Sequence, residues 1–506
     1  MQVREILNQL HLGKSVADAD SRLQRYFVDT YAFNVLVSGQ RDIIAGDKGT
    51  GKTALYKILI SRHRQIEALR ATEIVPAFNL AGSPVFQQLL TVPEQTEGQY
   101  IAFWKTYILT LIGNWIVDNP SIVKQVSLQR VEYFLTKNNL KTADISPGGI
   151  FSRLLARFPK IPIPRSVEME VGFSETGQPV LKPRIEFSPP AAVQPTNFFG
   201  IDYLAGLKLL EASLQESNLT IWIALDRLDE AFLGYPGVEV PALRALLRTY
   251  LDFNAAKHIR LKLFLRKDLF RKVTADGFVN LTHINDQKTE IHWDDEDLLN
   301  LLIVRIKDNP VVTEVLGLER LSNEAAFYKI FPAKIAQGEK QSVTWRWILS
   351  RIRDGNGVVA PRNLVDFMEN CREAQLRSEL RNPREYADGI SLIEADAVRK
   401  AHRTLSSTRV QDTLIAESKE LAPYIERFRK NKAEHNLDSL CTLLRVPSVE
   451  GEALAKSLIE IGFLEEAGNS YKVPLLYRDG LGITQGKAFE DSGAVSTSSD
   501  LNGDTE

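Results

Sequence analysis

Short, mainly apolar runs alternate along the first 290 positions with segments in which apolar residues recur every three or four places. Four such runs occupy residues 43–45, 74–80, 219–225 and 259–265. Runs that are mainly apolar are typical of buried strands in a parallel sheet, because helices cover both faces of such strands. Residues 54–60 and 201–217 have helical spacing. The alternation predicts a doubly wound α/β fold.

From about residue 290 the pattern becomes mainly helical. Helices are predicted over 298–307, 324–331, 344–353 and 361–367. Residues 385–435 continue this pattern, and 436–480 resemble a winged helix-turn-helix, with two short helices before a strand, a turn and a strand. The serine-rich and acidic tail from Gln485 is expected to be disordered.

The segment 84–200 separates the second predicted strand from the third and is interpreted as an insertion. It begins with a helical pattern and becomes rich in proline, with nine of the 22 prolines between Pro147 and Pro195. The runs 167–171 and 180–187 flank a turn-like stretch and predict a β-hairpin. We expect this insertion to contact a partner or to regulate the protein.

A chain of 506 residues is too long for one core, so several domains are expected. The predicted divisions are 1–83 (N-terminal segment and first part of a P-loop NTPase core), 84–200 (insertion), 201–290 (second part of the core), 291–435 (helical domain), 436–484 (winged helix) and 485–506 (tail). The predicted fold class is therefore an α/β parallel sheet with an inserted segment, followed by an α-helical domain and a winged helix.

Composition narrows the class of protein. Hydrophobic residues make up 44% and charged residues 25%, as in soluble globular proteins, and no stretch approaches the length of a membrane span. The start of the chain has no signal-peptide core, so a cytoplasmic protein is expected. Two cysteines, Cys371 and Cys441, exclude a disulfide framework, and a formal charge of −2 gives no global attraction to nucleic acid.

A complete phosphate-binding loop follows the first strand. It comprises Gly46, Asp47, Lys48, Gly49, Thr50, Gly51, Lys52 and Thr53, with Ala54 beginning the helix. A strand, loop and helix in this order present backbone N–H groups and the positive end of a helix dipole to a polyphosphate. Lys52 is expected to contact the β- and γ-phosphates, and the Thr53 hydroxyl to bind Mg²⁺. The predicted ligand is ATP with Mg²⁺.

Acidic residues end the third predicted strand. Asp226 stands where a carboxylate reaches a Mg²⁺ ion held by Thr53, directly or through water. Asp229 and Glu230 follow, and either of them could orient or deprotonate the water that attacks the γ-phosphate. A capping role for a lone aspartate is the alternative, but three acids after a strand favour a catalytic cluster.

Arg266 ends the fourth strand, at the sheet edge where open α/β folds bind ligands. Its guanidinium is a candidate for sensing or stabilising charge on the γ-phosphate. The alternative is an ion pair with a structural acid such as Asp268. Arg362, Arg244 and Arg248 are weaker candidates, because an exposed arginine on a helix is usually solvated.

The order of these motifs resembles the STAND class of signal-transducing P-loop ATPases. The order is the loop, Leu225 to Glu230, Leu263 to Arg266, a helical domain and a winged helix. They are particularly similar to bacterial P-loop ATPases, some of them encoded in phage-defence loci. The resemblance implies slow ATP hydrolysis, oligomerisation driven by ATP and a separate effector or sensor protein. Arg227 departs from the family pattern, and no effector sequence is identifiable.

A DNA-associated ATPase of the origin-recognition or transposition-helper kind is the alternative, since it would also combine such a core with a winged helix. Residues 436–480 contain four basic and seven acidic residues, a net charge of −3, which disfavours binding to phosphate backbones. Basic residues do gather between Arg427 and Lys432, so nucleic acid stays possible as a partner. A nucleotide-binding scaffold with negligible turnover is a third hypothesis.

Overall fold

A computed structural model describes residues 1–78, 96–157, 166–173, 179–186, 199–228, 236–275, 277–336, 338 and 341–489. The chain forms two compact units. One unit comprises Asp29–His292, and the other combines Met1–Val28 with the chain from Trp293 onward. The first 28 residues thus belong with the C-terminal unit, which position along the sequence did not indicate.

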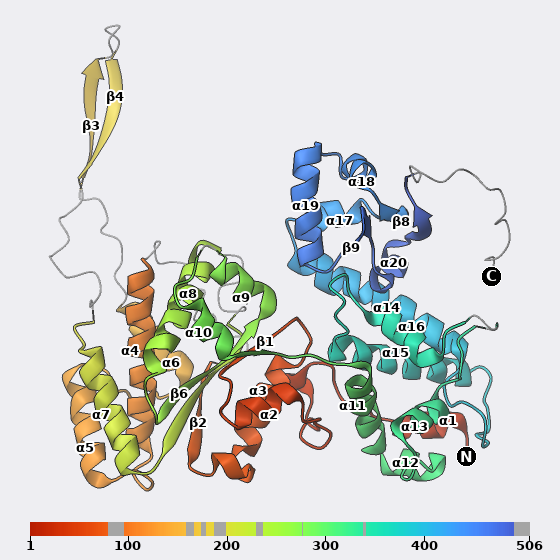
Figure 1. The fold of residues 1–506 in the computed structure, drawn as a ribbon, viewed down its shortest axis with the longest axis horizontal. Coiled ribbons are helices and arrows are strands. Elements are labelled where there is room, and N and C mark those ends of the chain that lie inside the picture. Colours follow the sequence, from red (N-terminus) through yellow and green to blue (C-terminus); the bar gives the residue numbers. More distant parts are fainter. Residues whose placement is uncertain are drawn as a thin grey trace. The chain divides into compact units, whose positions relative to one another are not determined.

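A five-stranded parallel sheet lies at the centre of the Asp29–His292 unit (Figure 1). Its strands are β1 (Ile43–Gly46), β2 (Thr72–Phe78), β5 (Thr220–Leu225), β6 (Ile259–Arg266) and β7 (Lys288–Glu290). They are arranged in the order β2-β5-β6-β1-β7, and every neighbouring pair is parallel. The predicted P-loop NTPase α/β fold is therefore confirmed. The edge strand β7 was not predicted, because Lys288-Thr289-Glu290 has no apolar run.

Helices pack around this sheet. They are α2 (Tyr31–Val37), α3 (Lys52–Arg62), α4 (Glu97–Asp118), α5 (Gln125–Lys137), α6 (Pro147–Ala156), α7 (Tyr203–Glu216), α8 (Pro236–Phe253), α9 (Lys267–Thr274) and α10 (Leu281–Asp286). Trp104 of α4 donates a hydrogen bond to the Ala242 carbonyl of α8 (2.8 Å), and Tyr107 donates to the Ala77 carbonyl of β2. Both aromatic side chains share one hydrophobic core with Ile223 of β5. The described helical part of the segment 84–200 is therefore built into the Asp29–His292 unit.

The predicted hairpin is present in the same segment. Strands β3 (Ser166–Phe173) and β4 (Pro179–Glu186) pair antiparallel as a two-stranded sheet of their own. The turn predicted at 174–178 lies outside the described residues. A role of this hairpin in partner contact or regulation stays a prediction.

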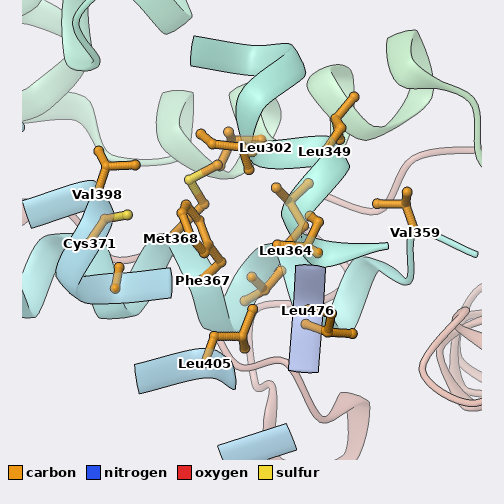
Figure 2. Close-up of a cluster of buried hydrophobic side chains, with 14 of the residues drawn as sticks. Leu302, Leu349, Val359, Leu364, Phe367, Met368, Cys371, Val398, Leu405 and Leu476 are labelled. Atoms are coloured by element: carbon orange, nitrogen blue, oxygen red, sulfur yellow. The ribbon is translucent and has the colours of Figure 1, made fainter. Parts of the chain in front are cut away.

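The second unit is mainly helical, as its pattern predicted. Its helices are α1 (Val3–Gln9), α11 (Asp295–Lys307), α12 (Pro310–Leu316), α13 (Asn323–Ile330), α14 (Thr344–Ile352), α15 (Pro361–Glu379), α16 (Ala395–Thr408), α17 (Ala422–Glu426), α18 (Leu437–Leu444), α19 (Ser448–Glu460) and α20 (Leu475–Leu481). Figure 2 shows Leu302 of α11, Leu364 and Met368 of α15 and Leu476 of α20 converging in its core. Cys371 is fully buried among these side chains, as an apolar residue would be.

Buried polar contacts join the N-terminal segment to this unit. The Arg305 guanidinium on α11 lies 3.2 Å from the Asp20 carboxylate and donates to the Leu12 carbonyl (2.7 Å). The ring of Tyr26 stacks beneath the same guanidinium, with 4.3 Å between the Arg305 Cζ atom and the ring centroid. A charge buried with this many partners holds the segment to α11.

The second unit also contains a four-stranded sheet, with its strands in the order β11-β8-β10-β9. Its strands are β8 (Lys432–His435), β9 (Glu465–Ala467), β10 (Ser470–Lys472) and β11 (Thr484–Lys487). The expectation of a disordered tail from Gln485 is wrong for its first residues, because β11 pairs parallel with β8 and Arg478 donates a hydrogen bond to Gln485. Residues 490–506 lie outside the described part.

Candidate nucleotide-binding site

The phosphate-binding loop connects β1 to α3 in the predicted geometry. β1 ends at Gly46, and α3 begins at Lys52 with Gly51 as its N-cap residue. Gly49 and Gly51 have φ values of +78° and +107°, which residues with a Cβ atom rarely adopt. These two glycines let the loop curl so that its backbone N–H groups and the N-terminus of α3 face an anion.

Polar contacts within the loop define its shape. The Lys52 ammonium donates to the carbonyl oxygens of Gly46 (2.9 Å) and Asp47 (3.0 Å). The Thr50 hydroxyl donates to the Asp47 carbonyl at 2.8 Å. Lys52 therefore lies folded back over its own loop, within reach of any phosphate that the loop holds.

Asp226 directly follows the last residue of β5, and its side chain is 1% exposed. The next residue, Arg227, has a left-handed backbone with φ of +58°, which turns the chain away from the strand direction. Asp226 is thus a buried carboxylate at the carboxyl edge of the sheet, as predicted. Asp229 and Glu230 lie outside the described residues, and their catalytic role stays a prediction.

Arg266 is the last residue of β6, the strand between β1 and β5. It occupies the same register position as Gly46. Its guanidinium forms two hydrogen bonds to the Asp268 carboxylate, from Nε (3.1 Å) and Nη2 (2.6 Å). Burial raises the pKa of the Asp268 carboxyl, but the hydrogen bonds and charge of Arg266 outweigh it and hold that pKa below its usual value. The ion pair considered from the sequence is therefore present.

The other candidate arginines lie in different surroundings. Arg244 and Arg248 both face the Glu97 carboxylate at the start of α4, and their guanidinium groups lie 5.8 and 5.4 Å from the centroid of the Phe278 ring. Arg362 is in the first turn of α15, in the other unit.

The residues present fit a nucleoside triphosphate with Mg²⁺. The glycine turn and the α3 N-terminus suit phosphate oxygens, Lys52 supplies a positive charge, and the Thr53 hydroxyl stands in the first turn of the helix. Asp226 is a buried carboxylate directly after β5, at the sheet edge where a carboxylate suits a bound metal ion. Thr53 and Asp226 would hold the ion, which would neutralise phosphate charge.

The motif search missed one residue of this edge. Tyr56 of α3 is 1% exposed, and its ring packs edge-on against Phe264 of β6, with the ring centroids 5.6 Å apart. Its packing against Phe264 is visible in the tertiary structure alone. The only signal in the sequence is its spacing, three residues after Thr53 and on the same face of the helix.

Comparison with known proteins gives distant likenesses. No family model matches the chain. The chain is 22% identical over 304 residues to the transposon gamma-delta 80.3 kDa protein of Escherichia coli (strain K12), a match that covers 58% of this chain and 39% of that protein. The chain thus spans about two fifths of the length of this curated relative.

Two solved structures are similar over most of their length. The Walker-type ATPase PABY2304 of Pyrococcus abyssi matches with a TM-score of 0.37 and 11% identity, over 94% of this chain and all of that one. The ORC2 protein of Aeropyrum pernix, in ADPNP–ADP complexes, matches with a TM-score of 0.33 and 14% identity, over 92% of this chain and 91% of that one. Likenesses this weak add nothing to the fold established by the sheet. Among the described residues, no helix has both the length and the apolar character needed to cross a bilayer.

Proposed function

We propose that this protein binds ATP with Mg²⁺, hydrolyses it slowly and acts as a nucleotide-dependent switch. The observation that carries the proposal is the order of strands at one sheet edge. The loop after β1, Arg266 at the end of β6 and Asp226 after β5 lie on three successive strands, and their carboxyl ends point the same way. This is where open α/β sheets bind ligands.

Each residue has a distinct part in the proposed reaction. Lys52 and the loop N–H groups bind the phosphates, while Thr53 and Asp226 hold the metal ion. Asp229 or Glu230 positions the attacking water. Arg266 stabilises the charge that develops on the γ-phosphate.

The Arg266–Asp268 pair supplies a physical basis for switching. Arg266 holds Asp268 through two hydrogen bonds, and a γ-phosphate in the loop would compete for the same guanidinium. A ligand shifts a conformational equilibrium only when it binds two states differently. Exchange of Arg266 between the Asp268 carboxylate and phosphate oxygens is such a difference, and it would move the start of α9, which carries Asp268.

The output of the switch is proposed to lie in another protein. The sequence resemblance to STAND and phage-defence ATPases supports ATP-driven assembly of several copies together with a separate effector, as in bacterial anti-phage defence. Size-exclusion chromatography with light scattering, with and without ATP and with the products of adjacent genes, tests this part of the proposal. An unchanged mass under all conditions would contradict it.

The nucleotide part of the proposal is tested by Lys52→Ala. We expect ATP affinity to fall by about 100-fold or more, because the variant loses the positive charge that contacts the phosphates. The control is Lys57→Ala, which removes an ammonium group from the same helix outside the loop. Calorimetric titration with ATP and Mg²⁺ measures both variants, and full affinity in Lys52→Ala would refute ATP binding at this loop.

A DNA-associated ATPase is the second candidate, favoured by the similarity to a protein named for a transposon. The elements α18, α19, β9 and β10 follow one another as in a winged helix, which supports a nucleic-acid or protein-binding module. Its charge argues against DNA, because α19 exposes Glu450, Glu452 and Glu460.

Basic residues before this module are also engaged within the chain. Arg429 forms two hydrogen bonds to Glu426 (2.7 and 2.8 Å), and Arg427 donates to the Leu444 carbonyl. Electrophoretic shifts with duplex DNA over a salt series separate the two candidates. Tight binding with a steep salt dependence would favour the DNA-associated ATPase.

A further inference from the structure

Tyr56 lies in the first half of α3, beside the sheet edge that carries the proposed site. It is three residues after Thr53, so the two side chains lie on the same face of the helix. The side chain is 1% exposed, and its ring meets Phe264 at 5.6 Å between centroids and 88° between ring planes. This edge-to-face packing fixes the ring and therefore the direction of its hydroxyl.

Phe264 in turn lies beside Asp226. Leu225 of β5 and Leu263 of β6 are register partners, so the next residues, Asp226 and Phe264, are level with each other on adjacent strands. Tyr56, packed on Phe264, thus reaches the strand end that carries the buried carboxylate. Burial first, and then the negative charge of Asp226, raise the pKa of the Tyr56 hydroxyl. A tyrosine hydroxyl carries its proton at neutral pH and is able to donate a hydrogen bond.

The Tyr56 hydroxyl differs from other buried or half-buried tyrosine hydroxyls of this unit. Tyr107 donates to the Ala77 carbonyl, Tyr250 donates to Asp42 at 3.1 Å, and Tyr203 lies 3.1 Å from the Thr106 hydroxyl. Within the described part of the chain, the Tyr56 hydroxyl makes no hydrogen bond. Native proteins rarely leave a buried polar group in this state, and where they do the group calls for an explanation.

We propose that Tyr56 is a positioning residue that donates a hydrogen bond to the Asp226 carboxylate when ATP and Mg²⁺ are bound, and thereby holds that carboxylate in the orientation that the metal requires. The inference rests on the proposed function and adds to it a residue outside the known motifs. A donor behind a metal-binding carboxylate sets its direction and so affects metal affinity and activity. The aromatic ring alone would fill the space beside Phe264, so packing does not explain the hydroxyl. The proposed hydrogen bond to Asp226 does.

Stability and turnover should therefore respond in opposite ways to Tyr56→Phe. The substitution keeps the ring against Phe264 and removes only a hydroxyl without a partner, so the melting temperature without nucleotide should stay equal or rise by about 1–2 °C. The matched control is Tyr203→Phe, which removes a half-buried hydroxyl that contacts Thr106. It should lower the melting temperature and leave turnover unchanged.

The decisive measurement is steady-state ATP hydrolysis over a Mg²⁺ series, with ATP affinity measured separately by calorimetry. For Tyr56→Phe we expect kcat to fall about 10-fold, the Mg²⁺ concentration at half-maximal rate to rise severalfold, and ATP affinity to change less than about twofold. A merely structural role would not move the Mg²⁺ dependence.

The possible failures are distinguishable. Unchanged kcat and Mg²⁺ dependence in Tyr56→Phe, with an active wild-type protein, would overturn the inference and leave the proposed function standing. A lowered melting temperature with equal losses of ATP affinity and kcat would overturn it too, because the hydroxyl would then be structural. A wild-type protein that binds ATP without turnover would overturn the proposed hydrolysis itself, and the inference with it.

Discussion

Gly46 and Arg266 are register partners on the adjacent parallel strands β1 and β6. Gly46 begins the phosphate-binding loop, so the guanidinium of Arg266 leaves the sheet at the same level as the loop. Residues so far apart in the chain reach one edge only because β6 lies between β1 and β5. This register places the positive charge of Arg266 beside the predicted phosphates.

Arg266→Ala should slow ATP hydrolysis by about 100-fold while ATP affinity falls much less, because transition-state charge loses its stabilising guanidinium. Asp268→Asn is the matched variant, since it keeps Arg266 and removes the negative charge that pairs with it. It should retain turnover. Initial rates and calorimetric affinities check both, and equal losses of rate in the two variants would show that the ion pair is structural.

Gly46→Ala should weaken ATP binding by about 10-fold or more through a steric clash. A Cβ atom at Gly46 would lie 2.5 Å from the Thr50 hydroxyl oxygen, which donates to Asp47, and 3.4 Å from Ile291 Cδ1. The loop would therefore have to shift. Titration with ATP measures the effect, and wild-type affinity would show that the loop tolerates the shift.

The control for this change is Gly200→Ala. Gly200 has a positive φ, +66°, unlike Gly46, and a Cβ atom there meets no heavy atom of the described residues within 4 Å. It should cost about 1 kcal/mol of stability from backbone strain and leave ATP affinity unchanged. Chemical unfolding of both variants separates the strain from the clash.

A buried ion pair predicts a rise in stability at alkaline pH. The Lys262 side chain is fully buried, 2.6 Å from Asp42 and 3.8 Å from the centroid of the Trp222 ring. Burial lowers its pKa to about 8, against the attraction of Asp42. In the unfolded chain the pKa returns to its ordinary value of 10.5, so between these values the unfolded state holds more protons than the folded state.

The free energy of unfolding should therefore increase with pH through this window, by about 2 kcal/mol between roughly pH 7.5 and 9.5. Urea unfolding at a series of pH values measures it. In Lys262→Met this increase should disappear, and the variant should be less stable by about 3–5 kcal/mol because Asp42 keeps its buried charge without the ammonium. The same slope in both proteins would contradict the assignment to Lys262.

The strand β11 predicts a sharp difference between two truncations. A variant ending at Ile483 loses the hydrogen bonds from Thr484 to the Asn431 carbonyl (2.9 Å) and from Ala488 to the Glu434 carbonyl (2.8 Å). Its melting temperature should fall by several degrees, about what a loss of 1–2 kcal/mol produces. A variant ending at Phe489 keeps these bonds and should melt like the full chain. Equal melting of the two variants would show that β11 adds no stability.

Local patterns predicted most of the core strands and the loop. The apolar runs that became β1, β2, β5 and β6 are visible in the sequence because a strand buried on both faces needs apolar residues at nearly every position. The loop is visible because a tight anion-binding turn needs glycines at particular places. The positions of Asp226 and Arg266 at strand ends follow from the same runs.

The elements that the pattern missed owe their place to partners distant in the chain. β7 and β11 carry polar residues and are strands because their backbones pair with β1 and β8. The sequence pattern of the segment 84–200 predicts an insertion and does not show how its helical part is held. In the structure Trp104 and Tyr107 donate hydrogen bonds to backbone carbonyls that are distant in the chain. Periodicity reports which face of an element is apolar and carries no information about what covers that face.

The sequence by itself thus determined the strands, the phosphate-binding loop and the acidic strand end, since each depends on residue types within a few positions. Only the tertiary structure decided that β6 lies between β1 and β5, that Asp268 holds Arg266, and that Tyr56 is buried against Phe264 of β6. Strand order and side-chain partners depend on contacts between segments that are distant in the chain, such as the strands of Gly46 and Arg266. The folded chain selects these contacts together, and no local pattern records them.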